Sequence, residues 1–206
     1  MKRIITIGRE LGSGGRTIGK MVANRLGISY YDREVIDEAA TKSGLSAIFI
    51  ETTEQKVTNS FLYNIAMGSS YGYGILPGAN RQSLPLAEQV YEAQTEAVRQ
   101  FADKGSCVIV GRCADYILAD REDVLRVFIY GDKKDRVEHA VKAYGMERES
   151  ALKELEKSDK ERSHHYSSFT DKKWGNRHNY DLMINSSLMS YEGCAKLISE
   201  VFKEND

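Results

Sequence analysis

The sequence has few cysteines and no excess of charge of either sign, and each shortage excludes a class of protein. Its three cysteines are an odd number without a C-x-x-C pair, so we expect no disulfide framework and a reducing compartment. Lysine and arginine total 29 against 30 aspartates and glutamates, which lacks the basic excess of a non-specific nucleic-acid binder. The expected partners are therefore small anionic molecules rather than nucleic acid.

Long hydrophobic runs are also missing. The N-terminal Met1-Lys2-Arg3 leads into only about five apolar residues before a glycine, too short for a signal peptide, and no later run could span a membrane. We expect a cytoplasmic protein with no membrane partner, and we find no internal repeat. With 206 residues and 41% hydrophobic content, the chain can bury a full core, so residues 1–206 are expected to form a single domain. The sequence does not indicate an oligomeric state.

A glycine-rich segment near the N-terminus is the most informative part of the chain. Residues 4–17 read IITIGRELGSGGRT: an apolar strand runs into a loop with glycines at positions 8, 12, 14 and 15, and a helix follows. Glycines let backbone N–H groups approach a polyanion, and the N-terminal end of a helix adds a positive dipole. The segment therefore predicts a phosphate site, against the alternative of a strand-to-helix turn without a ligand.

The segment is close to the phosphate-loop pattern G-x-x-x-x-G-K-S/T but departs from it. Gly15 stands where the lysine is expected, with Arg16 just after it, and the first glycine is displaced: Arg9 stands at its position and Gly8 lies one residue earlier. Two replacements are available: Arg16 can supply the missing cation to the β- and γ-phosphates, and Thr17 keeps the hydroxyl that ligates Mg²⁺. The phosphate cradle itself is expected at Gly12, Ser13, Gly14, Gly15, Arg16 and Thr17.

The remaining pattern alternates strands and helices. Apolar strand segments are expected at 4–7, 28–31, 107–110, 124–130 and 181–185, and helical stripes at 18–26, 35–40, 86–101, 137–144 and 194–202. Because the phosphate loop follows the first strand, this order predicts an α/β fold with a doubly wound, parallel five-stranded sheet of the P-loop NTPase type.

Two charged residues follow predicted strands, where a parallel sheet gathers its ligand-binding groups. Asp32 either caps the next helix or turns its carboxylate toward Mg²⁺ or an acceptor, and the two roles can coexist. Arg112 follows the buried strand 107–110 and suits bidentate binding of a phosphate; the alternative is a structural salt bridge to an acid such as Asp115.

Two less regular regions are expected to cover the site. Residues 45–85, with the glycine- and tyrosine-rich loop 68–74, predict a helical insert that binds the acceptor, and Arg81 beyond that loop is a candidate contact. Residues 146–178 predict a lid, whose charged stretch 154–162 either closes cations over the phosphates or forms an exposed, ion-paired helix. The adjacent histidines at 164 and 165 have no metal-type spacing, and no metal is assigned to them.

Four motifs together resemble the cytidylate kinase-like family of P-loop nucleoside monophosphate kinases. They are ITIGRELGSGG at 5–15, YDR at 31–33, VIVGRCAD at 108–115 and NYDL at 179–182, and the resemblance spans nearly the whole chain. It implies that the loop holds the phosphates of ATP, that Thr17 and Asp32 serve Mg²⁺, and that Arg112 holds the acceptor phosphate. It also makes Arg33 a candidate acceptor contact and matches Lys160 and Arg162 to lid cations.

The chain departs from the family pattern at three positions, with Gly15 for the loop lysine, Cys113 after Arg112, and Asn185 near the final strand. The resemblance implies ATP- and Mg²⁺-dependent phosphoryl transfer to a nucleoside monophosphate, CMP or dCMP first. Two alternatives stay open: a P-loop kinase for another small acceptor, and a nucleotide-binding regulatory protein that has lost the transfer reaction. Thr17, Asp32, Arg112 and the lid cations favour the enzyme, whereas Gly15 favours the binder.

Overall fold

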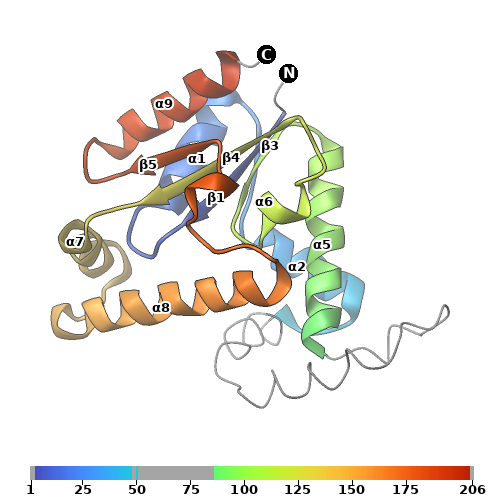
Figure 1. The fold of residues 1–206 in the computed structure, drawn as a ribbon, viewed down its shortest axis with the longest axis horizontal. Coiled ribbons are helices and arrows are strands. Elements are labelled where there is room, and N and C mark those ends of the chain that lie inside the picture. The colour runs from blue at the N-terminus through green and yellow to red at the C-terminus, as the bar shows by residue number, and fades with distance from the viewer. Residues whose placement is uncertain (1–2, 48–49, 51–85, 205–206) are drawn as a thin grey trace.

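A computed structural model describes residues 3–47, residue 50 and residues 86–204, and these form a sheet covered by helices on both faces (Figure 1). The strands are β1 Ile4–Arg9, β2 Ser29–Tyr31, β3 Cys107–Val110, β4 Val124–Tyr130 and β5 Leu182–Asn185. The helices are α1 Gly15–Leu26, α2 Glu34–Ser43, α5 Leu86–Lys104, α6 Ala114–Ile117, α7 Lys133–Tyr144, α8 Arg148–Phe169 and α9 Tyr191–Glu204.

All neighbouring strands pair in parallel, in the order β2-β3-β1-β4-β5, which confirms the predicted doubly wound sheet. The chain moves outward from β1 to one edge of the sheet and then returns to build the other edge. The carboxyl ends of β1 and β3 therefore lie side by side, with Ile7 paired to Val110 at the last step of their register. The glycine loop after β1 and the turn after β3 leave the sheet at this one edge.

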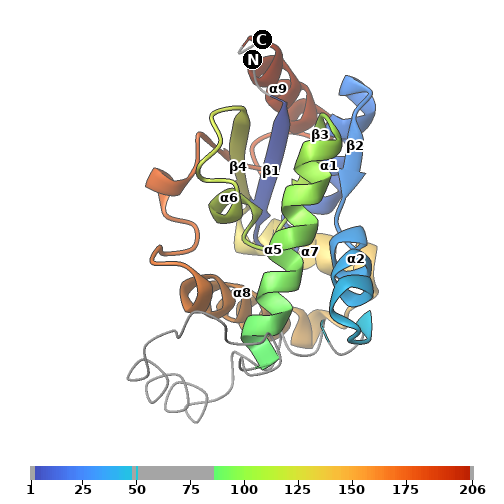
Figure 2. The same cartoon turned by 90° about the vertical axis from the view of Figure 1, so that its right-hand side faces the viewer.

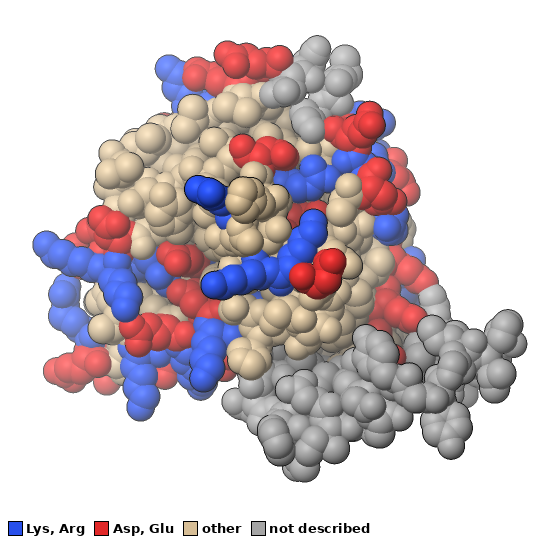
Figure 3. All heavy atoms as spheres, viewed as in Figure 1, with Lys and Arg blue, Asp and Glu red and all other residues tan. Residues whose placement is uncertain are grey.

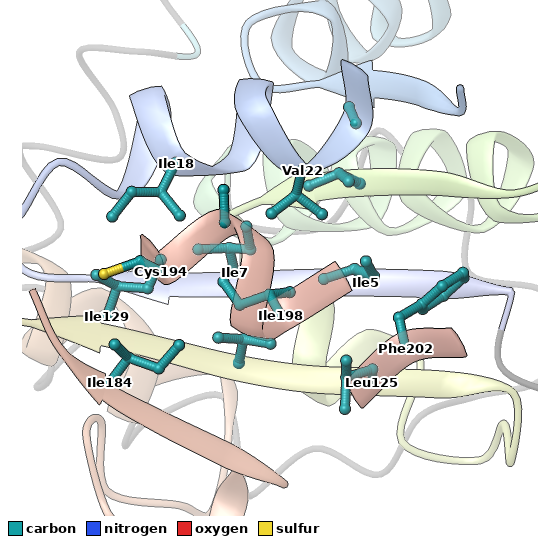
Figure 4. Packing of buried hydrophobic residues seen from close by; sticks show 14 of the residues in the cluster. Ile5, Ile7, Ile18, Val22, Leu125, Ile129, Ile184, Cys194, Ile198 and Phe202 are labelled. Atoms are coloured by element: carbon teal, nitrogen blue, oxygen red, sulfur yellow. The ribbon is translucent and has the colours of Figure 1, made fainter. Parts of the chain in front are cut away.

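The two faces of the sheet are covered because successive side chains of a strand point in opposite directions. Ile5 and Ile7 of β1 pack with Ile18 and Val22 of α1 and with Ile198 of α9 on one face (Figure 4). The apolar stripe predicted in the last helix therefore docks beside α1.

The opposite face of the sheet packs against α5 and α6. Ile4 of β1 and Ile109 of β3 contact a second cluster that includes Val98 and Phe101 of α5 and Ile117 of α6. Figure 2 shows α5 running along this face. The alternation of Ile4 and Ile5 between the two clusters explains why β1 reads as a continuous apolar run.

Helix α8 crosses below the carboxyl ends of the strands rather than packing along a face of the sheet (Figure 1). It is joined to the glycine loop by a hydrogen bond from the Leu11 N–H to the Asp159 carboxylate, at 2.8 Å. The region predicted as a lid thus contains a helix next to the predicted phosphate site. The predicted insert at 45–85 lies mostly outside the described residues.

One local expectation is wrong in part. Helix α2 has Arg33 at its N-cap position, and no side chain makes a cap hydrogen bond there. The carboxylate of Asp32 instead forms ion pairs with two arginines, and only its backbone N–H is bonded nearby, to Glu34. Asp32 is therefore turned toward the glycine loop and not toward the helix that follows it.

Within the described part of the chain, no helix combines the length and the apolar composition needed to cross a bilayer. The thiols of Cys107, Cys113 and Cys194 are free and buried.

Candidate functional site

The predicted phosphate cradle lies in a loop with left-handed turns at two glycines. Gly12 and Gly14 have φ values of 81° and 75°, which favour glycine, and Gly14 is the N-cap residue of α1. The loop runs directly into the N-terminus of this twelve-residue helix, where the unpaired N–H groups and the helix dipole attract anions. The predicted cradle residues are thus brought together at the start of α1.

Side chains from α7 and α8 fix the backbone of this loop at Leu11. The Arg136 guanidinium donates to the Leu11 carbonyl at 2.8 Å and forms ion pairs with Glu10, at 2.9 Å, and with Asp159. Asp159 in turn accepts the Leu11 N–H. Both backbone polar groups of Leu11 are therefore bonded to charged groups that belong to other elements.

Tyr191, the first residue of α9, supports the other side of the loop. Its ring lies so close to Gly14 that a Cβ there would run into it. The ring also packs edge-on against His139 of α7, with centroids 5.3 Å apart. The loop is thus held in shape by protein contacts on both sides.

Two arginines converge on Asp32 beside the loop. The Arg16 Nε lies 2.7 Å from Asp32 Oδ2, and the Arg9 Nη2 lies 3.8 Å from Asp32 Oδ1. Burial lowers the pKa of Arg9, and the nearby Asp32 carboxylate partly opposes that effect. Such a buried cation is stabilised by an anion that enters the site.

A third arginine reaches the same place from α8. The Arg162 Nη1 donates to the Arg9 carbonyl at 3.2 Å and lies 3.6 Å from Asp159 Oδ1. Burial, followed by the positive charge of Arg9, lowers the pKa of Arg162 to about 9. Arg162 is thus still mostly protonated at neutral pH, in surroundings that favour a bound anion.

Two cavities meet at these arginines. One, of about 250 Å³, lies along the glycine loop and is bordered by Tyr144 and Met146. The other, of about 200 Å³, lies between the end of β3 and α8, with Trp174 and Tyr180 in its wall. Both cavities are lined by the same three cations, which are Arg9, Arg16 and Arg162.

The second cavity contains the end of β3, where the backbone makes a left-handed turn. Gly111, Arg112 and Cys113 have φ values of 76°, 58° and 53°. Positive φ costs a residue with a side chain about 1 kcal/mol or more, and such outliers concentrate at functional sites. The turn places Arg112 in the cavity wall, as expected for a residue that binds the acceptor.

Polar groups of α6 and α8 line the rest of this cavity. Tyr166 donates to the Asp115 carboxylate at 2.7 Å, so the alternative partner considered for Arg112 is bonded to a tyrosine. Burial raises the pKa of Asp115. Both ring nitrogens of His165 are buried and have no hydrogen-bond partner among the described residues. Burial and the charge of Arg112 lower the pKa of His165 to about 4, which keeps the ring neutral at pH 7.

The surroundings of Asp32 fit the Mg²⁺ that accompanies ATP in kinases. Its Oδ1 is buried and accepts no hydrogen bond from the described residues. Mg²⁺ is usually held by one or two carboxylates together with phosphates and water. A carboxylate oxygen that makes only a 3.8 Å ion pair, with Arg9, and lies next to the glycine loop is such a ligand, so Asp32 would hold the ion.

Other predicted site residues lie apart from the two cavities. Thr17, Arg33 and Lys160 are exposed and line neither of them, so the structure brings Arg162 into the site but not Lys160. Arg81 lies outside the described residues. The outer side of α8 carries interspersed charges of both signs (Figure 3), for example the Lys133–Glu156 pair, as the alternative for this helix predicts.

The roles of Arg9, Arg136 and Asp159 were missed by the sequence interpretation, although the sequence held a signal for two of them. Arg9 ends a buried strand, which is the argument that predicted Arg112 at the edge of the sheet. On α8 the buried Ala151, Leu155 and Tyr166 mark an inner face, and Asp159 and Arg162 fall at the same helical spacing. No local pattern marks Arg136, because its importance comes from the loop that it contacts.

A parallel sheet with a glycine loop after its first strand and arginines at its carboxyl edge defines a P-loop kinase fold. The sequence matches the model of the cytidylate kinase-like family over residues 4–188, and the chain belongs to this family. No curated protein is significantly similar to the sequence.

Solved structures agree on the fold. An uncharacterized protein from Eubacterium ventriosum ATCC 27560 is 25% identical, with a TM-score of 0.71 over 98% of this chain and 99% of its own. Shikimate kinase from Bacteroides thetaiotaomicron is 12% identical, with a TM-score of 0.55 over 97% of this chain and 98% of its own. A sugar kinase from Janibacter sp. HTCC2649 is also 12% identical, with a TM-score of 0.53 over 96% and 92%.

Proposed function

We propose that the protein transfers the γ-phosphoryl group of ATP, with Mg²⁺, to the phosphate of a nucleoside monophosphate, and that CMP or dCMP is the preferred acceptor. Family membership supports phosphoryl transfer as the type of chemistry. The single observation that carries the proposal is the pair of cavities that share Arg9, Arg16 and Arg162. We place the triphosphate along the glycine loop and the acceptor phosphate at Arg112. The buried free thiols suit a reducing compartment, and we propose the cytoplasm.

The reaction needs positioning and charge compensation more than a base. An oxygen of the acceptor phosphate, already ionised at neutral pH, forms a bond to the γ-phosphorus while the bond to the β,γ-bridging oxygen breaks, and ADP leaves. The arginines between the cavities would face the equatorial oxygens of the transferring group. Fixed cations in a site that excludes water stabilise the charge of the transition state without reorganisation. Mg²⁺ held at Asp32 would neutralise part of the triphosphate charge.

The test is an assay of ADP release from ATP with CMP, dCMP, UMP, AMP or GMP, with and without Mg²⁺. We expect Mg²⁺-dependent turnover that is fastest with a cytidine monophosphate. Arg112→Ala is expected to raise the acceptor KM at least about 10-fold and to change the KM for ATP little, because Arg112 lines only the acceptor cavity.

Arg99→Ala is the matched control. Arg99, on α5, forms an exposed ion pair with Asp120, and neither residue lines either cavity, so the loss of Arg99 should leave both KM values unchanged. An unchanged acceptor KM in Arg112→Ala would remove Arg112 from its role. If no monophosphate raises ADP release in the wild type, the proposed acceptor class is wrong.

A further inference from the structure

We propose that Arg9 takes the place of the missing loop lysine, so that the cation has moved from position 15 to position 9. The inference rests on the proposed function, because it assigns the group that holds the triphosphate. In the register of G-x-x-x-x-G-K-S/T that places Gly15 at the lysine, Arg9 stands at the first glycine, with Gly8 one residue earlier, and Arg16 stands at the S/T position. In the structure the residues at 9 and 15 depend on each other, because the side chain of Arg9 occupies the space beside Gly15.

Space explains why Gly15 is a glycine. A Cβ at this position would lie 2.6 Å from the Cβ of Arg9, closer than real Cβ atoms approach other atoms. Gly15 has no positive φ, in contrast to Gly12 and Gly14, so its backbone would accept another residue. It is the side chain of Arg9 that excludes one. A lysine at 15 and an arginine at 9 cannot both be present with this backbone.

The surroundings of Arg9 hold it where the lysine would act. Arg9 is the last residue of β1, and its guanidinium lies over Gly111 at the end of β3, where any Cβ would collide with it. Its carbonyl accepts the hydrogen bond from Arg162. The side chain lines both cavities, so its charge lies between the loop and the turn that carries Arg112.

Arg16, the replacement expected from the sequence, is less suited. Its side chain is 55% exposed, whereas that of Arg9 is 13% exposed. Its Nε lies 2.7 Å from Asp32, so its charge is already compensated at close range, whereas Arg9 is 3.8 Å from the same carboxylate. A buried and weakly compensated cation attracts phosphate more strongly than an exposed and paired one.

The exchange can be reversed by mutation. We compare Arg9→Gly, Gly15→Lys and the double variant Arg9→Gly/Gly15→Lys, which restores the first glycine and the lysine of the ordinary pattern and leaves Arg16 in place. Arg9→Gly is expected to weaken binding of AMP-PNP with Mg²⁺, measured by calorimetry, at least 10-fold and to lower kcat about 100-fold. Gly15→Lys alone should also bind poorly, because the new side chain meets Arg9. The double variant should recover at least 10-fold in affinity over Arg9→Gly.

If Arg9 served packing alone, the double variant would not recover, because its lysine lies at position 15 on α1 and not at the end of β1. Arg9→Met, which keeps the aliphatic stem, guards against loss of fold in the glycine variant and is expected to show the same loss of binding. Arg16→Ala serves as the comparison, and it should weaken the binding of AMP-PNP less than Arg9→Met does.

The proposal is overturned if Arg9→Met binds AMP-PNP like the wild type, or if the double variant is no better than Arg9→Gly. A larger loss in Arg16→Ala than in Arg9→Met would assign the cation to Arg16 instead. AMP-PNP affinity is measured without turnover. A wild type that binds AMP-PNP but phosphorylates no monophosphate would contradict the proposed function while leaving this comparison of Arg9 and Arg16 decisive.

Discussion

At the scale of single residues, His165 has an environment that is typical of a ligand-binding cavity. Its ring packs against Phe169, with centroids 5.0 Å apart, and Phe169 stacks on Tyr91 of α5 at 4.3 Å. Yet both ring nitrogens are buried without a hydrogen-bond partner among the described residues. Buried polar groups of this kind usually cost stability, and where they persist they often serve a ligand. The ring lies in the wall of the proposed acceptor cavity.

The lowered pKa of His165 leads to a pH-dependent stability. Its pKa falls from 6.5 to about 4 on folding, so between these values the unfolded chain binds more protons than the folded one. Stability is therefore highest above pH 6.5 and decreases as the pH falls. For a shift of this size, the free energy of unfolding decreases by about 2 kcal/mol when the pH falls from 7.5 to 5.

His165→Phe keeps the packing on Phe169 and removes the titration. We expect urea unfolding to show that the wild type loses about 2 kcal/mol more than the variant between pH 7.5 and pH 5. Other titrating groups, such as Asp115 and His139, are present in both proteins and largely cancel in the comparison. Parallel pH profiles for the two proteins would mean that His165 is not buried as a neutral ring.

At the scale of elements, α7 and α8 are joined to the glycine loop by one largely buried cluster, in which Arg136 lies between Glu10 and Asp159. Burial raises the pKa of Glu10, although Arg136 opposes this. Removing one member of such a cluster leaves the charges of the others uncompensated, which commonly lowers the stability of the fold by about 3–5 kcal/mol. The cluster therefore couples the position of α8 to the shape of the glycine loop.

Asp159→Ala tests this coupling. The substitution removes the acceptor of the Leu11 N–H and one ion-pair partner of Arg136, so we expect about 3 kcal/mol less stability and a higher KM for ATP. Urea unfolding and steady-state kinetics measure the two effects.

Glu156→Ala is its control on the same helix. Glu156 pairs with Lys133, and this pair also joins α8 to α7, but the two side chains are 57% and 72% exposed. An exposed pair contributes about 0–1 kcal/mol, so this variant should behave like the wild type. Equal effects of the two substitutions would mean that the buried cluster does not control the loop.

The elements themselves were largely predictable, and the reason is physical. Strands buried on both faces read as apolar runs, as 107–110 does, and helices that cover a sheet carry a regular apolar stripe, as 194–202 does. On α8 Arg162 was expected to face the site as a lid cation, but the contact of Asp159 with the glycine loop was not predicted, because Asp159 lies among the many charges of that helix. Charged side chains on a helix usually face solvent, whereas here contacts with the glycine loop turn some of them inward.

At the scale of the whole molecule, the fold gathers charge at one edge. The sequence is close to neutral, with a net charge of −1, yet Arg9, Arg16, Arg112 and Arg162 all line one cavity. They come from β1, α1, the turn after β3, and α8, which are far apart along the chain. Such clustering follows from the strand order and is invisible in the composition. The glycine loop, Arg16, Arg112 and Arg162 could be predicted singly, but neither Arg9 nor the gathering of these cations in one cavity could.

The most direct test of the account is the affinity of a bisubstrate ligand, adenosine and cytidine joined through five phosphates, measured by calorimetry with Mg²⁺. If the two cavities form one continuous path past Arg9, Arg16 and Arg162, this ligand should bind about 100-fold more tightly than ATP or CMP alone. Arg112→Ala should remove most of that gain. Binding no tighter than that of ATP would contradict the claim that the shared arginines lie between a donor and an acceptor.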